Sequence, residues 1–121
     1  ISADTYAVLR RSAAAVIVPC RPSLPDILAA IETRKALGDA ATRAAVVLNF
    51  TKHTGREHLQ YMREAATRGG FHVLDHTLSD RLDYYRALTT PGLLWATDNE
   101  KAIVELDRVF VEIVAWIATL S

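Results

Sequence analysis

Residues that could bind phosphate are sparse in this chain. Neither of the glycine-rich phosphate-binding patterns, G-x-x-x-x-G-K-[ST] and G-x-G-x-x-G, occurs in the sequence. The adjacent glycines Gly69 and Gly70 follow an expected helix, and the carboxyl end of a helix repels phosphate. The sequence therefore predicts no phosphate cradle within these residues.

Metal-binding and nucleophilic side chains also lack suitable neighbours. His72, Asp75 and His76 are close in sequence, but on a strand His72 and Asp75 point to opposite faces, so ordinary surface and loop roles are favoured. Cys20 follows an expected buried strand, at the end where α/β folds place ligand sites. A free cysteine there is more often a small buried hydrophobe. An enzyme that uses Cys20 stays open as a third interpretation.

Other polar side chains follow expected strands. The segment Pro19–Asp26 joins a strand to a helix and contains good capping residues. Asn49 directly ends a second strand, and the third strand leads to a loop with Ser79, Asp80 and Arg81. Because open α/β sheets bind ligands at the carboxyl ends of their strands, the elements that position these side chains matter most.

Three short apolar runs predict the strands. Ala15–Val18, closed by Pro19, and Ala44–Leu48 are continuous, as buried parallel strands are, and Phe71–Leu74 is the third run. Helix-length segments separate the runs, which indicates βαβ units and a parallel sheet. The expected fold is therefore α/β, a parallel three-stranded sheet with flanking helices, in a single partial domain over residues 1–121.

Helix starts are predicted by side chains that accept hydrogen bonds from the first free amides. The expected N-caps, in chain order, are Asp4, Ser23, Thr54 and Thr97, and the last two begin capping boxes that Glu57 and Glu100 complete. Glycines are expected to end the second and third helices at Gly38 and Gly69. A shorter helix is expected over 82–88, before a break at Thr90–Gly92.

The last expected helix carries two patterns. Its predicted buried stripe consists of Ile103, Leu106, Phe110, Ile113, Ile117 and Leu120. A charged ladder on the face expected to be opposite consists of Lys101, Glu105, Arg108 and Glu112.

Composition excludes several classes of protein. Half of the 121 residues are hydrophobic and 23% are charged, so the chain is too apolar for a disordered tail. Fourteen basic and fourteen acidic residues give zero formal net charge. This balance does not indicate a surface covered by a polyanion or by a membrane. A single cysteine fits a reducing cytosol, and no apolar run reaches the ~18–20 residues of a membrane span. The expected location is the cytoplasm.

Three strands are few for an open α/β sheet, which usually has about five or six. A sheet of three parallel strands also leaves two edge strands with unpaired backbone N–H and C=O groups. We therefore expect these residues, which begin at Ile1 rather than Met, to be part of a larger sheet. Either an N-terminal half is missing or another chain completes the sheet.

The order of these features resembles the C-terminal half of the ParA/MinD-type partition ATPases, a deviant-Walker branch of the P-loop NTPases. The matching segments are Val16–Pro19, Pro22–Asp26, Val47–Asn49 and Asp80–Arg81, in that order, and the resemblance covers nearly the whole chain. Their order and spacing carry the resemblance, because no single motif is specific. In this family the P-loop lysines and the acidic switch residues lie in the N-terminal half, and none of them is present here.

The resemblance implies roles for individual residues. Asn49 matches the asparagine that reads the adenine edge, for which an amide offers both a donor and an acceptor. Ser79 and Asp80 match the segment that packs near the base. Arg81 and Arg86 match a region that contacts DNA non-specifically in relatives, and solvated surface charge is the equal alternative for both.

For the parent protein, the resemblance implies ATP and Mg²⁺ as cofactors. It also implies a homodimer, non-specific DNA and a centromere-binding partition protein as partners, and no membrane. This chain would carry the adenine-side wall and part of the DNA-binding and dimer surface, without hydrolysing ATP or holding it tightly. The alternative is a catalytically inactive α/β module that dimerises, or binds another protein, through an exposed sheet edge or the last helix.

Overall fold

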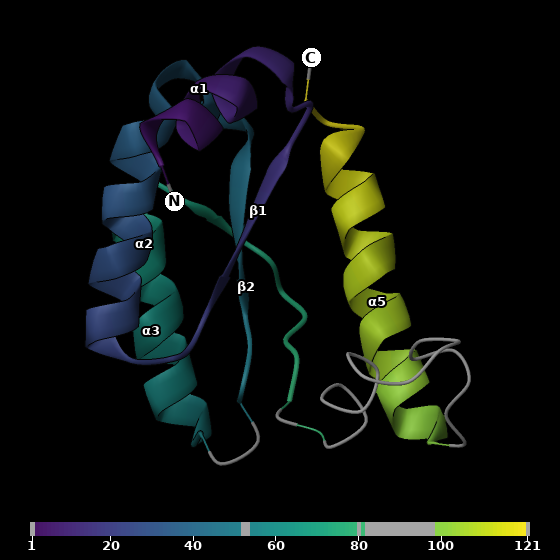
Figure 1. Cartoon of the computed structure of the whole chain (residues 1–121). Coiled ribbons are helices and arrows are strands. Elements are labelled where there is room, and N and C mark those ends of the chain that lie inside the picture. The colour runs from purple at the N-terminus through teal and green to yellow at the C-terminus, as the bar shows by residue number, and fades with distance from the viewer. Residues whose placement is uncertain (1, 52–53, 80, 82–98, 121) are drawn as a thin grey trace.

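The computed structural model describes residues 2–51, 54–79, 81 and 99–120. The elements are α1 (Ala3–Ser12), β1 (Val16–Cys20), α2 (Leu24–Leu37), the 3-10 helix η1 (Gly38–Arg43), β2 (Ala44–Leu48), α3 (Arg56–Arg68), β3 (His72–Val73) and α5 (Glu100–Ile117). Figure 1 shows α1, α2 and α3 on one side of the strands and α5 on the other. Among the described residues, no helix combines the length and apolarity that crossing a membrane requires. The helix predicted over 82–88 lies outside the described ranges.

The strands form one parallel sheet in the order β1-β2-β3, which confirms the predicted α/β class and the three-stranded parallel sheet. The register aligns Val16 with Ala44 and Cys20 with Leu48. All five residues of β2 are buried, as a central strand covered on both faces requires. β2 therefore matches its predicted bounds and forms the middle of the molecule.

β3 is shorter than the predicted run Phe71–Leu74, because regular pairing with β2 covers two residues. Backbone contact nevertheless continues along β2. The amide of Leu74 donates to the carbonyl of Val46 (2.9 Å), and the amide of Leu78 donates to the carbonyl of Leu48 (2.9 Å). The chain after β3 thus stays beside β2 up to the carboxyl edge of the sheet.

β1 extends to Cys20, two residues beyond the predicted end at Val18. That prediction was wrong because proline is tolerated on an edge strand. The amide of Asn49 donates to the carbonyl of Cys20 (2.9 Å), so the backbone of Cys20 turns toward β2 and that of Pro19 turns the other way. No described strand pairs on that side, so the missing N–H of Pro19 costs no ladder bond in this sheet.

Two cores occupy the two faces of the sheet. Alternate residues of β2 point to opposite faces, so Val46 and Leu48 pack against α2 and α3 while Val47 packs against α5. The first core also contains Ile27, Ala30 and Leu37 of α2 and Met62 and Ala66 of α3. Among the described elements, α5 alone covers the second face, with Val109 and Trp116 buried against the strands.

The predicted N-cap of the second helix is confirmed and that of the first is wrong. Ser23 caps α2 by accepting from the amide of Asp26 (3.4 Å), and Gly38 ends the helix at φ +56°, where glycine is not strained. At α1 the hydroxyl of Ser2, not Asp4, accepts the first amide bond, from Thr5 (3.2 Å). Asp4 instead lies in the first turn, where a carboxylate favours the helix dipole.

The two predicted capping boxes are also corrected. α3 begins after Gly55 with no side-chain cap, so Thr54 does not cap it. The amide of Thr54 donates instead to the carbonyl of Thr51 (3.1 Å). α5 is capped by Asn99, whose side chain accepts from the amides of Lys101 and Ala102, and not by Thr97, which lies outside the described residues.

The buried face of α5 is rotated from the predicted stripe. Its buried side chains are Ala102, Val109 and Trp116. Val109 and Trp116 pack against the sheet, with Ile113 and Leu120 beside them. Phe110 and Ile117 of the predicted stripe are instead 61% and 39% exposed. Apolar residues occupy most of the circumference of this helix, so spacing alone does not identify which arc meets the sheet.

Candidate functional site

The segments that follow β2 and β3 lie side by side at the carboxyl edge of the sheet. The amide of Thr51 donates to the carbonyl of Leu78 (3.3 Å), and the hydroxyl of Thr51 donates to the hydroxyl of Thr77 (3.3 Å). These bonds continue the contact between Leu78 and Leu48 described above. Residues 49–51 and 77–79, which the sequence separates by more than twenty positions, therefore form one surface.

Asn49 lies at this edge, directly after the central strand, as the sequence predicts. Its side-chain oxygen Oδ1 is buried and has no hydrogen-bond partner among the residues that the structure describes. The side chain lines a groove of about 290 Å³ with the end of β1 and the first turns of α2, including Pro19, Asp26 and Thr33. A buried acceptor without a partner costs about 1–3 kcal/mol, so this oxygen is poised to accept a bond from a ligand.

The residue after Asn49 holds a strained backbone. Among the residues that the structure describes, Phe50 is the non-glycine residue with a positive φ, at +54°. The guanidinium of Arg21, which follows β1, lies 4.6 Å from the centre of the Phe50 ring. The ends of β1 and β2 are thus joined by a cation–π contact beside the groove, and strain of this kind concentrates at functional sites.

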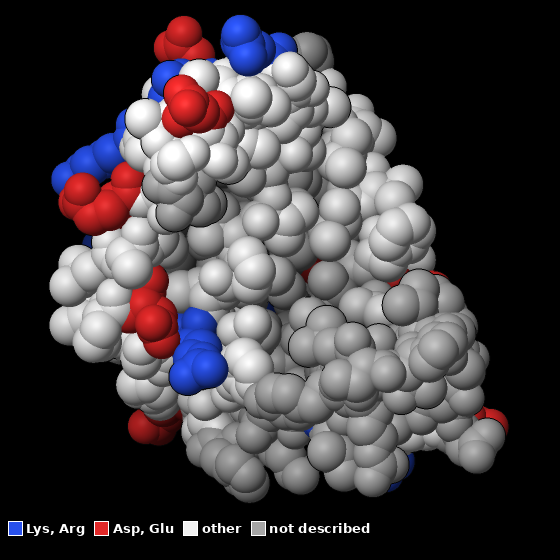
Figure 2. Space-filling model, in the orientation of Figure 1, with Lys and Arg blue, Asp and Glu red and all other residues white. Residues whose placement is uncertain are grey.

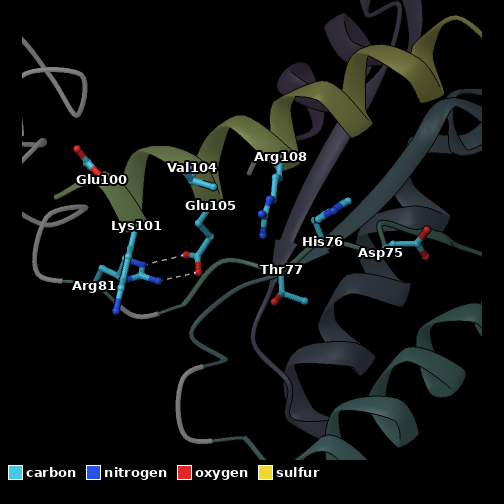
Figure 3. Close-up of a pocket in the computed structure, with 9 residues that line it drawn as sticks. All are labelled: Asp75, His76, Thr77, Arg81, Glu100, Lys101, Val104, Glu105 and Arg108. Atoms are coloured by element: carbon cyan, nitrogen blue, oxygen red, sulfur yellow. Dashed lines mark hydrogen bonds and ion pairs between the residues drawn. The ribbon is translucent and has the colours of Figure 1, made fainter.

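Ser79 and Arg81 are held against α5 by Glu105. Figure 3 shows the Arg81 side chain beside this glutamate. The amide and the hydroxyl of Ser79 both donate to the carboxylate of Glu105 (2.8 Å each), and the Arg81 guanidinium donates to the same carboxylate at 3.2 and 3.3 Å. The side chain of Arg81 is 25% exposed. Of the other predicted site residues, Asp80 and Arg86 lie outside the described residues.

A second glutamate of α5 grips the start of the same loop. Glu112 accepts from the amides of Asp75 (2.6 Å) and His76 (2.8 Å) and from Nδ1 of His76 (2.8 Å). On the opposite side, the guanidinium of Arg63 from α3 donates to the carbonyls of Leu74 (2.6 Å) and Asp75. We call Glu105, Glu112 and Arg63 the loop clamp, because together they fix the chain that follows β3.

The sequence pattern does not predict the loop clamp, because it places the charged ladder of α5 on the face opposite the buried stripe. Glu105 and Glu112 are seven residues apart, so they share one helix face, and that face meets the loop. The available signal was this seven-residue spacing of two acids beside a predicted polar loop rich in free amides.

The loop clamp makes the stability of the protein depend on pH in the acidic range. Burial would raise the pKa of Glu112, but the backbone bonds from His76 and Asp75 outweigh it and hold that pKa below its usual value of 4.5. A carboxyl with a lowered folded-state pKa stabilises the protein above its unfolded pKa, and this contribution is lost as pH falls through the folded value.

We therefore expect wild type to have a higher free energy of unfolding than Glu112→Gln, and we expect this difference to be constant around neutral pH. The difference should shrink below about pH 4.5. Urea unfolding of both proteins from neutral pH to about pH 3 measures it. A difference that stays constant across the series would show that the charge on Glu112 does not hold the loop.

The remaining candidates give little chemistry. Burial, and then the charge of Asp26, raise the pKa of Cys20 to about 11, so its thiol is neutral and weakly nucleophilic at neutral pH. His72 stacks on Trp116 with ring centres 5.6 Å apart. In the part of the chain that the structure describes, no three His, Cys, Asp or Glu side chains gather as a metal site would require.

Charge on the face shown in Figure 2 is mixed, with acidic and basic side chains interleaved along its described edge. This agrees with a formal net charge of zero. Comparisons of the chain with protein-family models, with curated proteins and with solved structures gave no match.

Proposed function

We propose that this chain forms the adenine-side part of a nucleotide-binding α/β domain of the ParA/MinD type. The observation that carries the proposal is the buried Oδ1 of Asn49, which lacks a partner among the described residues and lies directly after the central strand. The exocyclic amino group of adenine is a donor that would satisfy this oxygen, while the Asn49 amide donates to a ring nitrogen. One side chain would then read both groups on that edge of the base.

The surroundings of Asn49 support a ligand at this edge. Open parallel sheets bind ligands outside the carboxyl ends of their strands, and the segments after β2 and β3 meet there. The strained Phe50 backbone adjoins the same place. Ser79, the other described residue that the resemblance assigns to the base, lies on the β3 side of this surface, where Glu105 holds its amide.

In the proposed parent protein, residues outside this chain supply the phosphate ligands, the Mg²⁺ ligands and the catalytic groups. The parent would act in the cytoplasm as an ATP-dependent homodimer that coats DNA and responds to a centromere-binding partner. A DNA contact by Arg81 would compete with its bond to Glu105, so DNA binding by this residue would weaken the loop clamp.

The test compares two asparagines that receive the same change. Asn49→Asp keeps the acceptor but removes the donor and adds a charge. Asn99→Asp adds the same charge at the cap of α5, where aspartate caps as well as asparagine. Titration of the chain with adenosine, followed by amide NMR, is expected to give saturable shifts at Asn49 and Thr51. Asn49→Asp should weaken this binding at least about tenfold, and Asn99→Asp should leave it unchanged.

The absence of saturable shifts with adenosine, or equal binding by both variants, contradicts the proposed role of Asn49. For the parent protein, the corresponding measurements are ATPase activity and ATP-dependent DNA binding. Two flat results there would remove the partition-ATPase proposal.

The outer face of α5 favours a second candidate function, a dimerisation or protein-interaction module. The exposed large apolar side chains in the second half of this helix are Phe110, Val111, Val114 and Ile117. Such a cluster is typical of an interaction surface. Light scattering distinguishes the candidates, because a stable homodimer with no affinity for adenosine supports the module, and a monomer that binds adenosine supports the nucleotide site.

A further inference from the structure

A second pocket lies between the chain after β3 and the first turns of α5 (Figure 3). Its volume of about 560 Å³ falls within the range of small-molecule sites. It is lined from the loop side by Asp75, His76, Thr77 and Arg81, and from the helix by Glu100, Lys101, Val104, Glu105 and Arg108. It is separate from the groove beside Asn49, which is lined by β1 and α2.

The charged groups of this pocket do not pair as the sequence pattern suggests. Lys101, Glu105, Arg108 and Glu112 alternate at helical spacing, which in solvent would form ion pairs along the helix. The structure instead turns Glu105 to Ser79 and Arg81, and Glu112 to His76. Among the described residues, neither Lys101 nor Arg108 has a carboxylate within ion-pair distance.

Figure 3 shows how the charged groups point. The side chains of Lys101 and Arg108 extend from α5 toward the loop. The carboxylates of Asp75 and Glu100, at the two margins, point away from the space between them. The carboxylate of Glu105 is bonded to the Arg81 guanidinium, so that pair is compensated. Lys101 and Arg108 therefore line the pocket without an ion-pair partner among the described residues, while the carboxylates of Asp75 and Glu100 lie at its margins.

We propose that this pocket binds the phosphate group of a small phosphorylated molecule between Lys101 and Arg108. The two residues are seven positions apart, so their Cα atoms are separated by about 10.5 Å along the helix axis. Both long side chains can reach a dianion placed between them, and Arg108 can bond two of its oxygens. Val104, which lies between them on the helix, offers an apolar contact for the organic part of the ligand.

The experiment uses inorganic phosphate and the 121-residue chain. Amide NMR spectra are recorded over a phosphate titration, with potassium chloride holding the ionic strength constant, because salt screens exposed charges. Saturable shifts are expected at Thr77, Lys101 and Arg108, with half-saturation in the millimolar range. Arg108→Gln and Lys101→Gln should each raise the half-saturation concentration at least about tenfold, because each removes a charge-assisted contact.

Lys35→Gln is the matched control, because Lys35 pairs with Glu32 on the exposed surface of α2. It should leave the phosphate response unchanged, and so should Asn49→Asp, which separates this site from the proposed adenine site. Shifts that stay linear with phosphate, or a response that survives both pocket variants, overturn the proposal. A short DNA duplex that shifts the same amides at far lower concentration than phosphate also overturns it, because the site would then contact a nucleic-acid backbone.

Discussion

Trp116→Ala is expected to lower the free energy of unfolding by about 3–5 kcal/mol. Trp116 is 9% exposed, packs in the core formed by Ala45 and Val47, and stacks on His72. Truncation removes the largest side chain with which α5 contacts the sheet and leaves a cavity between them. Because a domain of this size is stable by roughly 5–15 kcal/mol in total, we expect a large fall in the urea midpoint.

Phe110→Ala is the control on the same helix. The sequence pattern places Phe110 in the buried stripe, but the structure leaves it 61% exposed, so its loss should change the free energy of unfolding by less than about 1 kcal/mol. Both variants are measured at concentrations where the chain is monomeric. Equal costs for the two substitutions, or a larger cost for Phe110→Ala, would falsify the orientation of α5.

Glu112→Ala is expected to cost about 2 kcal/mol, the second largest effect. The side chain is 16% exposed and accepts three hydrogen bonds, two of them from backbone amides. Hydrogen bonds to a charged group contribute about 1.5–3 kcal/mol each, and water replaces part of that here because the amides lie near the surface. Hydrogen exchange at the amides of Asp75 and His76 should accelerate most, since these amides lose their acceptor.

Glu32→Ala removes a carboxylate of a different kind. Glu32 and Lys35 form a surface pair with side chains 73% and 69% exposed, and such a pair contributes little. We expect no measurable change in the urea midpoint and no change in exchange at Asp75 or His76. If Glu112→Ala behaves like Glu32→Ala, the loop after β3 is held by other contacts than the carboxylate.

The parts of the fold that the sequence predicts well are those fixed by local chemistry. Ala44–Leu48 is continuous and small or β-branched, and it is a fully buried strand. Ser23 and Gly38 mark the bounds of α2, because a hydroxyl cap and a glycine with positive φ each suit one position. The parallel sheet follows from the helices between the strands.

The parts that the sequence does not predict depend on which surfaces meet. α5 is apolar on two arcs, and only contact with the sheet selects the one with Trp116. The position of Asn49 follows from strand order, whereas the environment of Ser79 and Arg81 depends on Glu105, more than twenty residues away. Long-range bonds of this kind leave no local pattern, because either partner alone is an ordinary surface residue.

The proline in β1 has a consequence for aggregation. Within Val16–Cys20, alternate residues direct their backbone toward β2, which leaves Ile17 as the residue whose N–H can serve an incoming strand on the outer border. A foreign peptide that docks there would form one such bond where an uninterrupted strand forms two. The outer edge of β1 is thus a poor template for cross-β aggregation. A strand that needs no hydrogen bond from Pro19 could still pair with this edge.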